Sequence, residues 1–231
     1  MSTQSRTGEQ SRMTAQIELG LMDPPAPSEP QALCTGACVL RGFALEAMPR
    51  LLAAIDGVIE GAPLRHMITP GGFCMSVAMT NCGALGWVSD RRGYRYTGID
   101  PQSGAPWPQM PGVFRVLARA AGERAGFAGF APDACLINRY EPGARLTLHQ
   151  DRDERDFRQP IVSVSIGLPA TFQFGGIKRS ERTRRVPLRH GDVVVWGGPA
   201  RLYHHGVLPL EPGVHELTGA ARLNLTFRHV G

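Results

Sequence analysis

Several short segments after residue 134 alternate apolar and polar side chains with a period of two, and turns containing Gly or Pro separate them. In residues 161–166 (IVSVSI), the aliphatic side chains at even positions share one face and two serines lie on the other. Residues 171–174, 193–196 and 222–228 are further segments of this kind. A period of two is typical of strands that bury one face. The pattern predicts a mainly β, α+β fold: a double-stranded β-helix (jelly roll) with flanking helices from the N-terminal part.

The chain of 231 residues is long enough for one sizeable domain, and its 28 Gly and 19 Pro suit a fold with many turns. Residues 1–32 are rich in Ser, Gln, Pro and Gly, and we expect a disordered extension because they offer too little apolar surface to offset the entropy of ordering. Residues 33–231 are expected to form a single domain. Helical spacing of apolar residues predicts helices over 43–60 and 113–125, the second closed by Gly126.

The chain carries a net charge of +5 and has a sequence pI near 9.3. A basic surface attracts polyphosphate chains, but charge alone does not separate a nucleic-acid partner from an incidentally basic protein. Five cysteines, with no apolar leader segment, indicate free thiols in a reducing compartment. Cys34 and Cys38 lack a second pair at matching spacing, so zinc is not expected. Since no segment is apolar enough to span a membrane, we expect a cytoplasmic monomer without membrane contact.

A His-x-Asp pair, His149 and Asp151, is followed more than fifty residues later by the adjacent histidines His204 and His205. On an extended strand, residues two apart project to the same side, and a third ligand can come from another strand. Two histidines and one carboxylate form the facial triad that holds non-haem Fe(II) and leaves open positions for a substrate and O₂. Such pairs also occur by chance, so the spacing alone is a weak signal for iron.

The segment 222–228 (RLNLTFR) places Arg222, Asn224, Thr226 and Arg228 on one strand face and its apolar residues on the other. If the polar face lines a cavity, two buried arginines need an anion between them, and a dicarboxylate would satisfy both. The alternative is an ordinary exposed strand with solvated arginines. Upstream, Asn138 and Tyr140 also share one face; they can donate to carboxylate oxygens of the same acid, or simply pack in the core.

Four long runs stand out in this part of the chain: residues 135–151 (CLINRYEPGARLTLHQD), 160–176 (PIVSVSIGLPATFQFGG), 190–198 (HGDVVVWGG) and 222–228. They closely resemble the bacterial AlkB-type alkylation-repair dioxygenases. The resemblance continues upstream through residues 75–83 (MSVAMTNCG), 85–87 (LGW), 99–102 (IDPQ) and 106–108 (PWP). It covers roughly residues 33–231, and its ordered motifs are far more specific than the triad spacing.

The resemblance implies ligands for Fe(II) and for the cosubstrate 2-oxoglutarate. His149, Asp151 and His205 would hold the iron, because the family's third ligand directly precedes a glycine; His204 would pack or face solvent. Six residues around the predicted anion site would bind 2-oxoglutarate: Asn138, Arg139, Tyr140, Arg222, Asn224 and Arg228. Of these, Arg222 with Tyr140 and Asn224 would hold the distal carboxylate, and Arg228 with Asn138 the carboxylate near the iron. O₂ would take the last metal position.

The family resemblance also implies a nucleotide-recognition lid over the barrel mouth, here about residues 63–97. Enzymes that act on a base extrude it and stack it between flat side chains. Trp87 would stack on the flipped base opposite His149, unless it is a core tryptophan. The segment of Tyr94, Arg95 and Tyr96 would contact the phosphate backbone. Four further residues would face the substrate, with Asp153 meeting the exocyclic amine of the base: Thr69, Met79, Asp153 and Arg179.

By this resemblance, the protein is expected to be an Fe(II)/2-oxoglutarate-dependent DNA repair dioxygenase. It would demethylate 1-methyladenine and 3-methylcytosine in single- or double-stranded DNA, with RNA as an alternative substrate. Each turnover would convert 2-oxoglutarate to succinate and release the methyl group as formaldehyde. Two other hypotheses remain open: a dioxygenase of the same fold that acts on a small molecule or a protein side chain, and a non-catalytic damage-binding protein.

Overall fold

The structure, a computed structural model, describes residues 29–231. Most of the predicted N-terminal extension therefore lies outside the described residues. The first strand, β1, begins at Gln31, so two residues assigned to the extension instead pair with β2. These residues, Gln31 and Ala32, pair with Val39 and Cys38 on the neighbouring antiparallel strand.

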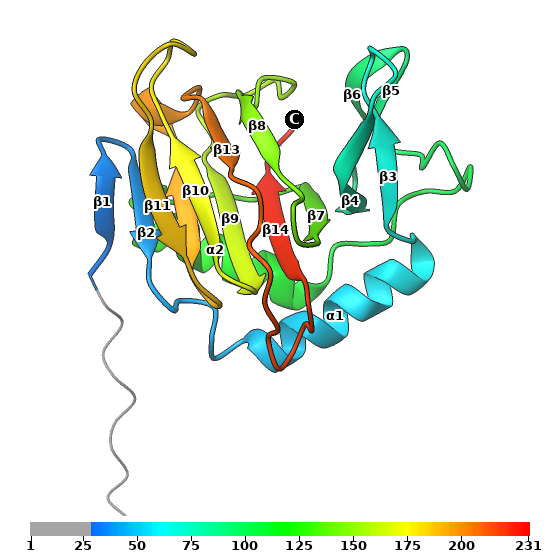
Figure 1. The fold of residues 1–231 in the computed structure, drawn as a ribbon, viewed down its shortest axis with the longest axis horizontal. Helices are drawn as coiled ribbons and strands as arrows, with labels where there is room; N and C mark the ends of the chain where they lie inside the picture. Colours follow the sequence, from blue (N-terminus) through cyan, green and yellow to red (C-terminus); the bar gives the residue numbers. More distant parts are fainter. Residues whose placement is uncertain (1–28) are drawn as a thin grey trace, which may run out of the picture.

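Two antiparallel sheets face one another and form the jelly roll expected from the alternating segments (Figure 1). The large sheet has the order β1 (Gln31–Cys34), β2 (Ala37–Leu40), β12 (Val193–Trp196), β9 (Ile161–Gly167), β14 (Arg222–Arg228), β7 (Ala134–Tyr140), β4 (Cys74–Gly83) and β3 (Arg65–Ile68). The small sheet has the order β11 (Arg184–Leu188), β10 (Ala170–Phe174), β13 (His205–Val207) and β8 (Leu146–His149). All four segments predicted from the period of two are confirmed as strands.

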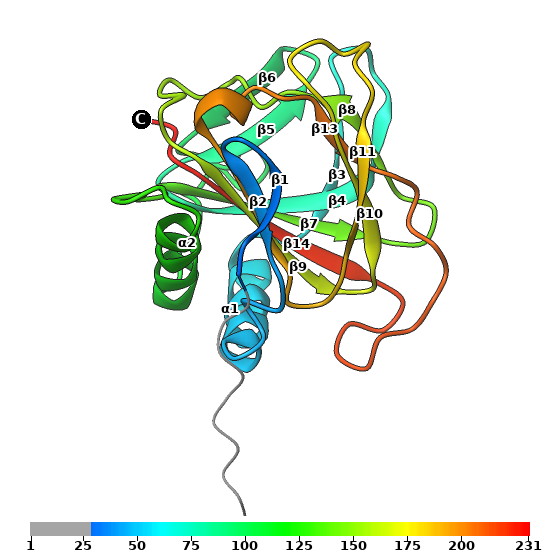
Figure 2. The same ribbon diagram turned by 90° about the vertical axis from the view of Figure 1, so that its left-hand side faces the viewer.

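Two helices, α1 (Met48–Gly61) and α2 (Gly112–Arg124), cover the outer face of the large sheet (Figure 2). Their buried residues form one hydrophobic cluster with Val162, Val164, Leu225 and Phe227. The apolar faces of β9 and β14 are thus packed against helices, and their polar faces point the other way, between the two sheets.

The second predicted helix is confirmed to within one residue, whereas the first was predicted five residues too long at its start. Residues 43–47 form turns, and α1 begins at Met48. Pro49 lies in its first turn, where a fixed φ and a missing N–H favour a helix start.

The segment expected to form a lid contains four strands, β3, β4, β5 (Gly86–Asp90) and β6 (Gly93–Thr97). Strands β3 and β4 belong to the large sheet, since β4 pairs with β7, whereas β5 and β6 form a separate two-stranded ribbon. In Figure 1 the strands β3, β4, β5 and β6 lie together on the right, apart from the strands of the small sheet. The Asn81 side-chain amide fixes the ribbon to β4: it donates to the carbonyl of Trp87 at 2.9 Å and accepts from its N–H at 3.0 Å.

Candidate active site

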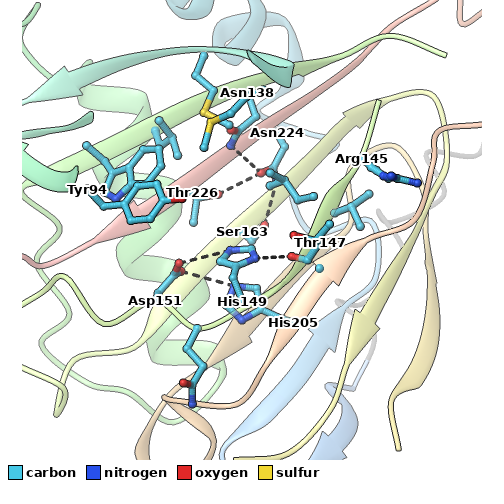
Figure 3. A pocket seen from close by; sticks show the side chains of 18 of the residues that line it. Tyr94, Asn138, Arg145, Thr147, His149, Asp151, Ser163, His205, Asn224 and Thr226 are labelled. Atoms are coloured by element: carbon cyan, nitrogen blue, oxygen red, sulfur yellow. Dashed lines mark hydrogen bonds and ion pairs between the residues drawn. The ribbon is translucent and has the colours of Figure 1, made fainter. Parts of the chain in front are cut away.

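A cavity of about 820 Å³ opens between the facing sheets and the β5–β6 ribbon. It brings together residues that are far apart in the sequence: the His-x-Asp pair, His205, the polar face of β14, and Trp87 with Asp153 at its edge. The close-up in Figure 3 shows the side chains of His149, Asp151, His205, Asn224 and Thr226 converging from strands of both sheets and the loop after β8.

His149 and His205 are direct cross-strand partners on the antiparallel pair β8 and β13. Their ring centroids lie 4.5 Å apart. Asp151 follows two residues after His149, and its carboxylate oxygens lie 3.6 Å from Nε2 of each imidazole. The three ligand atoms all fall within 4.8 Å of one another, which is a spacing that one metal ion can bridge.

The hydrogen bonds of the two imidazoles leave Nε2 free on both rings. His149 Nδ1 lies 2.8 Å from the carbonyl of Thr147, and His205 Nδ1 lies 3.0 Å from the carbonyl of Tyr203. Because a carbonyl only accepts, each Nδ1 carries the proton, and each Nε2 presents a lone pair toward Asp151 (Figure 3). A backbone carbonyl that orients a metal-binding histidine in this way is a common feature of metal sites.

The protonation states of this cluster suit a cation. Burial, together with the neighbouring His205, lowers the pKa of His149 to about 4. Burial alone would raise the pKa of Asp151, but the Arg228 guanidinium beside it holds that pKa well below its usual range. At neutral pH, His149 is therefore neutral and Asp151 ionised, which are the forms that bind a metal. Two imidazoles and one carboxylate fit Fe(II) with three positions left open.

His204 differs from its neighbour in its surroundings. Its Nδ1 lies 3.3 Å from the carbonyl of Gly176, and it is not part of the three-residue cluster. The geometry thus favours His205 as the third ligand, as the position before glycine implied.

Arg222 is 1% exposed and has an incomplete set of partners. Its Nη2 donates to Ser165 Oγ at 3.0 Å, and its guanidinium lies 4.9 Å above the ring of Tyr140. Its Nε and Nη1 have no hydrogen-bond partner, and within residues 29–231 no carboxylate pairs with it. Burial lowers its pKa, with Tyr140 opposing the shift. A buried guanidinium with two unused donors fits one carboxylate of an anionic cosubstrate.

Arg228, at the other end of β14, contacts the triad itself. Its Nη2 donates to Asp151 Oδ2 at 2.8 Å, and its Nε lies 3.3 Å from Glu154 Oε1. Between the two arginines, Asn138 Oδ1 is buried without a partner and lines the same cavity. The face of β14 that the alternation assigned to a cavity therefore does line one.

Two members of the expected 2-oxoglutarate set are placed differently from the others. The amide nitrogen of Asn224 donates to Ser163 Oγ and to the carbonyl of Val164, so binding an acid would require it to give up one of these bonds. Arg139 does not line the cavity: the alternation of β7 turns it to the opposite face, where it pairs with Glu141 at 3.6 Å. The expected contact of Arg139 with the cosubstrate does not fit this placement.

Of the eight residues expected to meet the substrate, seven line the cavity: Trp87, Tyr94, Tyr96, Asp153, Thr69, Met79 and Arg179. Four of the eight are placed or engaged differently from the expectation. Met79 is buried, and Arg179 donates to the carbonyl of Leu148. Arg95 lies outside this lining and is paired with Asp90 at 2.7 Å. The hydroxyl of Tyr96 points inward and donates to Glu154 at 2.6 Å, so it is already engaged.

Glu154 and Arg201 form a buried ion pair that the sequence reasoning missed. Their side chains are 2% and 3% exposed and lie 3.0 Å apart. Arg201 also donates to the backbone carbonyl of Asp151 at 2.8 Å. Glu154 thereby connects Tyr96 on the ribbon with the loop that carries Asp151. Its position, three residues after the candidate ligand, was the available signal, but an acidic residue in a loop is usually exposed.

Comparison with known proteins gives a family and close relatives. The family model described as the 2OG-Fe(II) oxygenase superfamily matches residues 36–228. The alpha-ketoglutarate-dependent dioxygenase AlkB of Escherichia coli K12 is 56% identical over 213 residues, which are 91% of this chain and 99% of that protein. The DNA N(6)-methyladenine demethylase ALKBH1D of Arabidopsis thaliana is 33% identical over 174 residues, 64% of this chain and 38% of that protein. The solved structure of OsALKBH1 superposes with a TM-score of 0.75 at 28% identity and covers 87% of this chain and 99% of that one.

The helices of residues 29–231 are too short or too polar to cross a membrane.

Proposed function

This chain belongs to the 2OG-Fe(II) oxygenase superfamily and is an Fe(II)/2-oxoglutarate-dependent dioxygenase; on this premise we propose that it removes methyl groups from N-alkylated bases in nucleic acid. The substrates would be 1-methyladenine and 3-methylcytosine in DNA, with RNA as an alternative. One observation carries the proposal: an aromatic ring, Trp87, and a carboxylate with one unpaired oxygen, Asp153, share one cavity with the candidate iron triad.

We assign His149, Asp151 and His205 as the residues that hold Fe(II). Bound there, the iron supplies the oxidation of an N-methyl carbon by O₂, coupled to decarboxylation of 2-oxoglutarate to succinate; the hydroxylated methyl group is then lost as formaldehyde. Arg222 would hold the distal carboxylate of the cosubstrate with its two unused donors, beside Tyr140. Arg228, which already contacts Asp151, would hold the carboxylate nearer the triad.

The remaining residues would receive the base. Trp87 offers a flat surface at the cavity mouth, and His149 lies within the same cavity. Asp153 places a negative charge there, which favours the cationic forms of these methylated bases. The cavity is large enough for a base beside the cosubstrate, since small-molecule sites commonly enclose 300–1,000 Å³. The basic chain, with a net charge of +5, suits a polyanion.

The test is repair of a single-stranded oligonucleotide that carries one 3-methylcytosine, with Fe(II), ascorbate and 2-oxoglutarate. We expect restored cytosine and formaldehyde, and neither product with Asp151→Ala. Repair rates on RNA and on duplex DNA of the same sequence would show which of the three nucleic acids is the preferred substrate. Turnover of 2-oxoglutarate without binding or repair of any oligonucleotide at low salt would overturn the proposal and favour a small-molecule substrate.

A further inference from the structure

Trp87 makes a hydrogen bond that base stacking does not require. Its indole Nε1 donates to Asp153 Oδ2 at 2.8 Å. Within the part of the chain that the structure describes, this is the sole hydrogen bond or ion pair recorded for the Asp153 side chain. The other carboxylate oxygen, Oδ1, is therefore left without a partner at the cavity mouth.

Of the two residues, Trp87 is the one that is held in place. The Asn81 amide fixes its backbone from both sides, as described above. Its ring stacks on Tyr94 with centroids 5.5 Å apart and planes inclined by 12°. Asp153, in contrast, is exposed and lies in an irregular loop.

Because Trp87 is fixed and Asp153 is exposed, Trp87 orients the Asp153 carboxylate and not the reverse. A fixed indole N–H that engages one oxygen of an exposed carboxylate restricts the rotation of that carboxylate. The free oxygen then keeps one orientation and can only accept a hydrogen bond, because an ionised carboxylate has no proton to donate. Tyr94 stacks on one face of the Trp87 ring, so a base would have to stack on the opposite face.

We propose that Trp87 is a positioning residue that, through its indole N–H, aims the free oxygen of Asp153 at the exocyclic group of the bound base. The inference rests on the proposed function and adds a selection rule to it. Alkylated adenine and cytosine present an amino group, which donates to this oxygen. Alkylated guanine and thymine present a carbonyl oxygen, which meets another acceptor and loses its hydration without a replacement. The site therefore favours lesions with an amino group.

The experiment measures kcat/KM on two single-stranded oligonucleotides that differ in one base, 3-methylcytosine or 3-methylthymine. Trp87→Phe keeps an aromatic face and removes only the donor. We expect the ratio of the two kcat/KM values to fall about tenfold or more, the loss expected when a hydrogen bond to a charged group is weakened. The smaller ring can weaken stacking of both bases, and the larger fall in kcat/KM should be for 3-methylcytosine. A role in stacking alone would lower both values together and leave the ratio unchanged, which would overturn the proposal.

Two further variants separate positioning from general damage. Trp107→Phe is the matched control, since its indole also donates a hydrogen bond, to the carbonyl of Thr97, but lies outside the cavity. It should leave the ratio unchanged; an equal fall would contradict a specific role of Trp87. In an Asp153→Ala background, Trp87→Phe should have no further effect on the ratio, and additive effects would overturn the proposal.

Wild-type behaviour distinguishes this inference from the proposed function. If the wild type turned over 2-oxoglutarate but repaired neither oligonucleotide, the proposed function would fall and the positioning role with it. If it repaired both while Trp87→Phe preserved their ratio, the positioning role alone would be overturned.

Discussion

Arg228 donates to Asp151 at 2.8 Å, so an arginine assigned to the cosubstrate is in direct contact with a candidate iron ligand. The same carboxylate lies 3.6 Å from Nε2 of both His149 and His205. This contact keeps Asp151 ionised and oriented, since burial alone would favour its neutral form. The metal site and the anion site therefore share a side-chain contact.

Asp151→Ala should abolish turnover and leave the fold intact. Without the carboxylate, only two imidazoles remain, which hold Fe(II) far more weakly. The measurement is iron content after dialysis, together with formaldehyde release and circular dichroism. Asp156→Ala on the same loop is the control, because Asp156 pairs with Arg158 and lies outside the cavity. Near-wild-type activity of Asp151→Ala at low micromolar iron would rule out this triad.

His204→Ala should retain iron, whereas His205→Ala should lose it. His205 presents a free Nε2 toward Asp151, and His204 is not part of the cluster. Anaerobic titration with Fe(II), followed by optical absorption with 2-oxoglutarate present, compares the two variants directly. The opposite outcome would exchange the two histidines in the assignment.

Arg222→Lys should raise the KM for 2-oxoglutarate about 10- to 100-fold, as expected when charge-assisted hydrogen bonds worth about 1.5–3 kcal/mol are lost. Lysine keeps the charge but lacks the planar fork whose Nε and Nη1 are unused in the structure. Arg139→Lys is the matched control and should leave this KM unchanged, because Arg139 faces away from the cavity. An unchanged KM in Arg222→Lys would contradict the assignment of β14 to the cosubstrate.

Glu154→Gln should destabilise the protein by about 3–5 kcal/mol, since it breaks a buried ion pair and leaves Arg201 uncompensated. For a chain of this size the melting temperature should fall on the order of 10 °C. Glu60→Gln, at an exposed position, is the control and should melt like the wild type. If both variants melted alike, the pair would contribute nothing to stability.

His190 should make the fold less stable as pH falls. Burial and the nearby His215 lower the pKa of His190, and Glu216 opposes this shift. Nδ1 of His190 accepts a hydrogen bond from the N–H of Gly167 at 3.0 Å. A folded-state pKa below the unfolded value of about 6.5 means that the unfolded chain binds more protons as pH drops. The stability contribution is present above about pH 6.5 and is lost on acidification.

The check is thermal melting of wild type and His190→Asn between pH 7.5 and 5.5. Asparagine offers an oxygen acceptor to Gly167 and does not titrate, so its melting temperature should fall less over this range. Parallel curves for the two proteins would show that His190 does not contribute.

Alternation along the strands was sufficient to predict four strands, β9, β10, β12 and β14. In residues 222–228 it separated the face packed on the helices from the face that lines the cavity, and both assignments hold in the structure. Alternation did not predict β11, because this strand contains Pro187 and exposed arginines. Strand β11 lies at the edge of the small sheet, where the missing N–H of a proline is tolerated. The start of α1 was missed because apolar spacing continues into the preceding turns.

The metal-binding residues of the site could be predicted from the sequence. The orientation of a side chain that depends on a hydrogen-bond partner elsewhere in the chain could not. The His-x-Asp spacing located the cluster, since its members are cross-strand or two residues apart. The inward turn of the Tyr96 hydroxyl depends on Glu154, a partner from a distant segment that local pattern does not reveal. The outward position of Arg139, in contrast, follows from the alternation of β7, because Asn138 and Tyr140 on either side of it face the cavity.

The most direct test of the account is the stoichiometry of a single turnover on an oligonucleotide that contains one 3-methylcytosine. Succinate, formaldehyde and restored cytosine should form in equal amounts at equal rates, and all three should disappear together in Asp151→Ala. Succinate formed at the same rate with methylated and unmethylated oligonucleotide, without formaldehyde or restored cytosine, would contradict demethylation in this cavity.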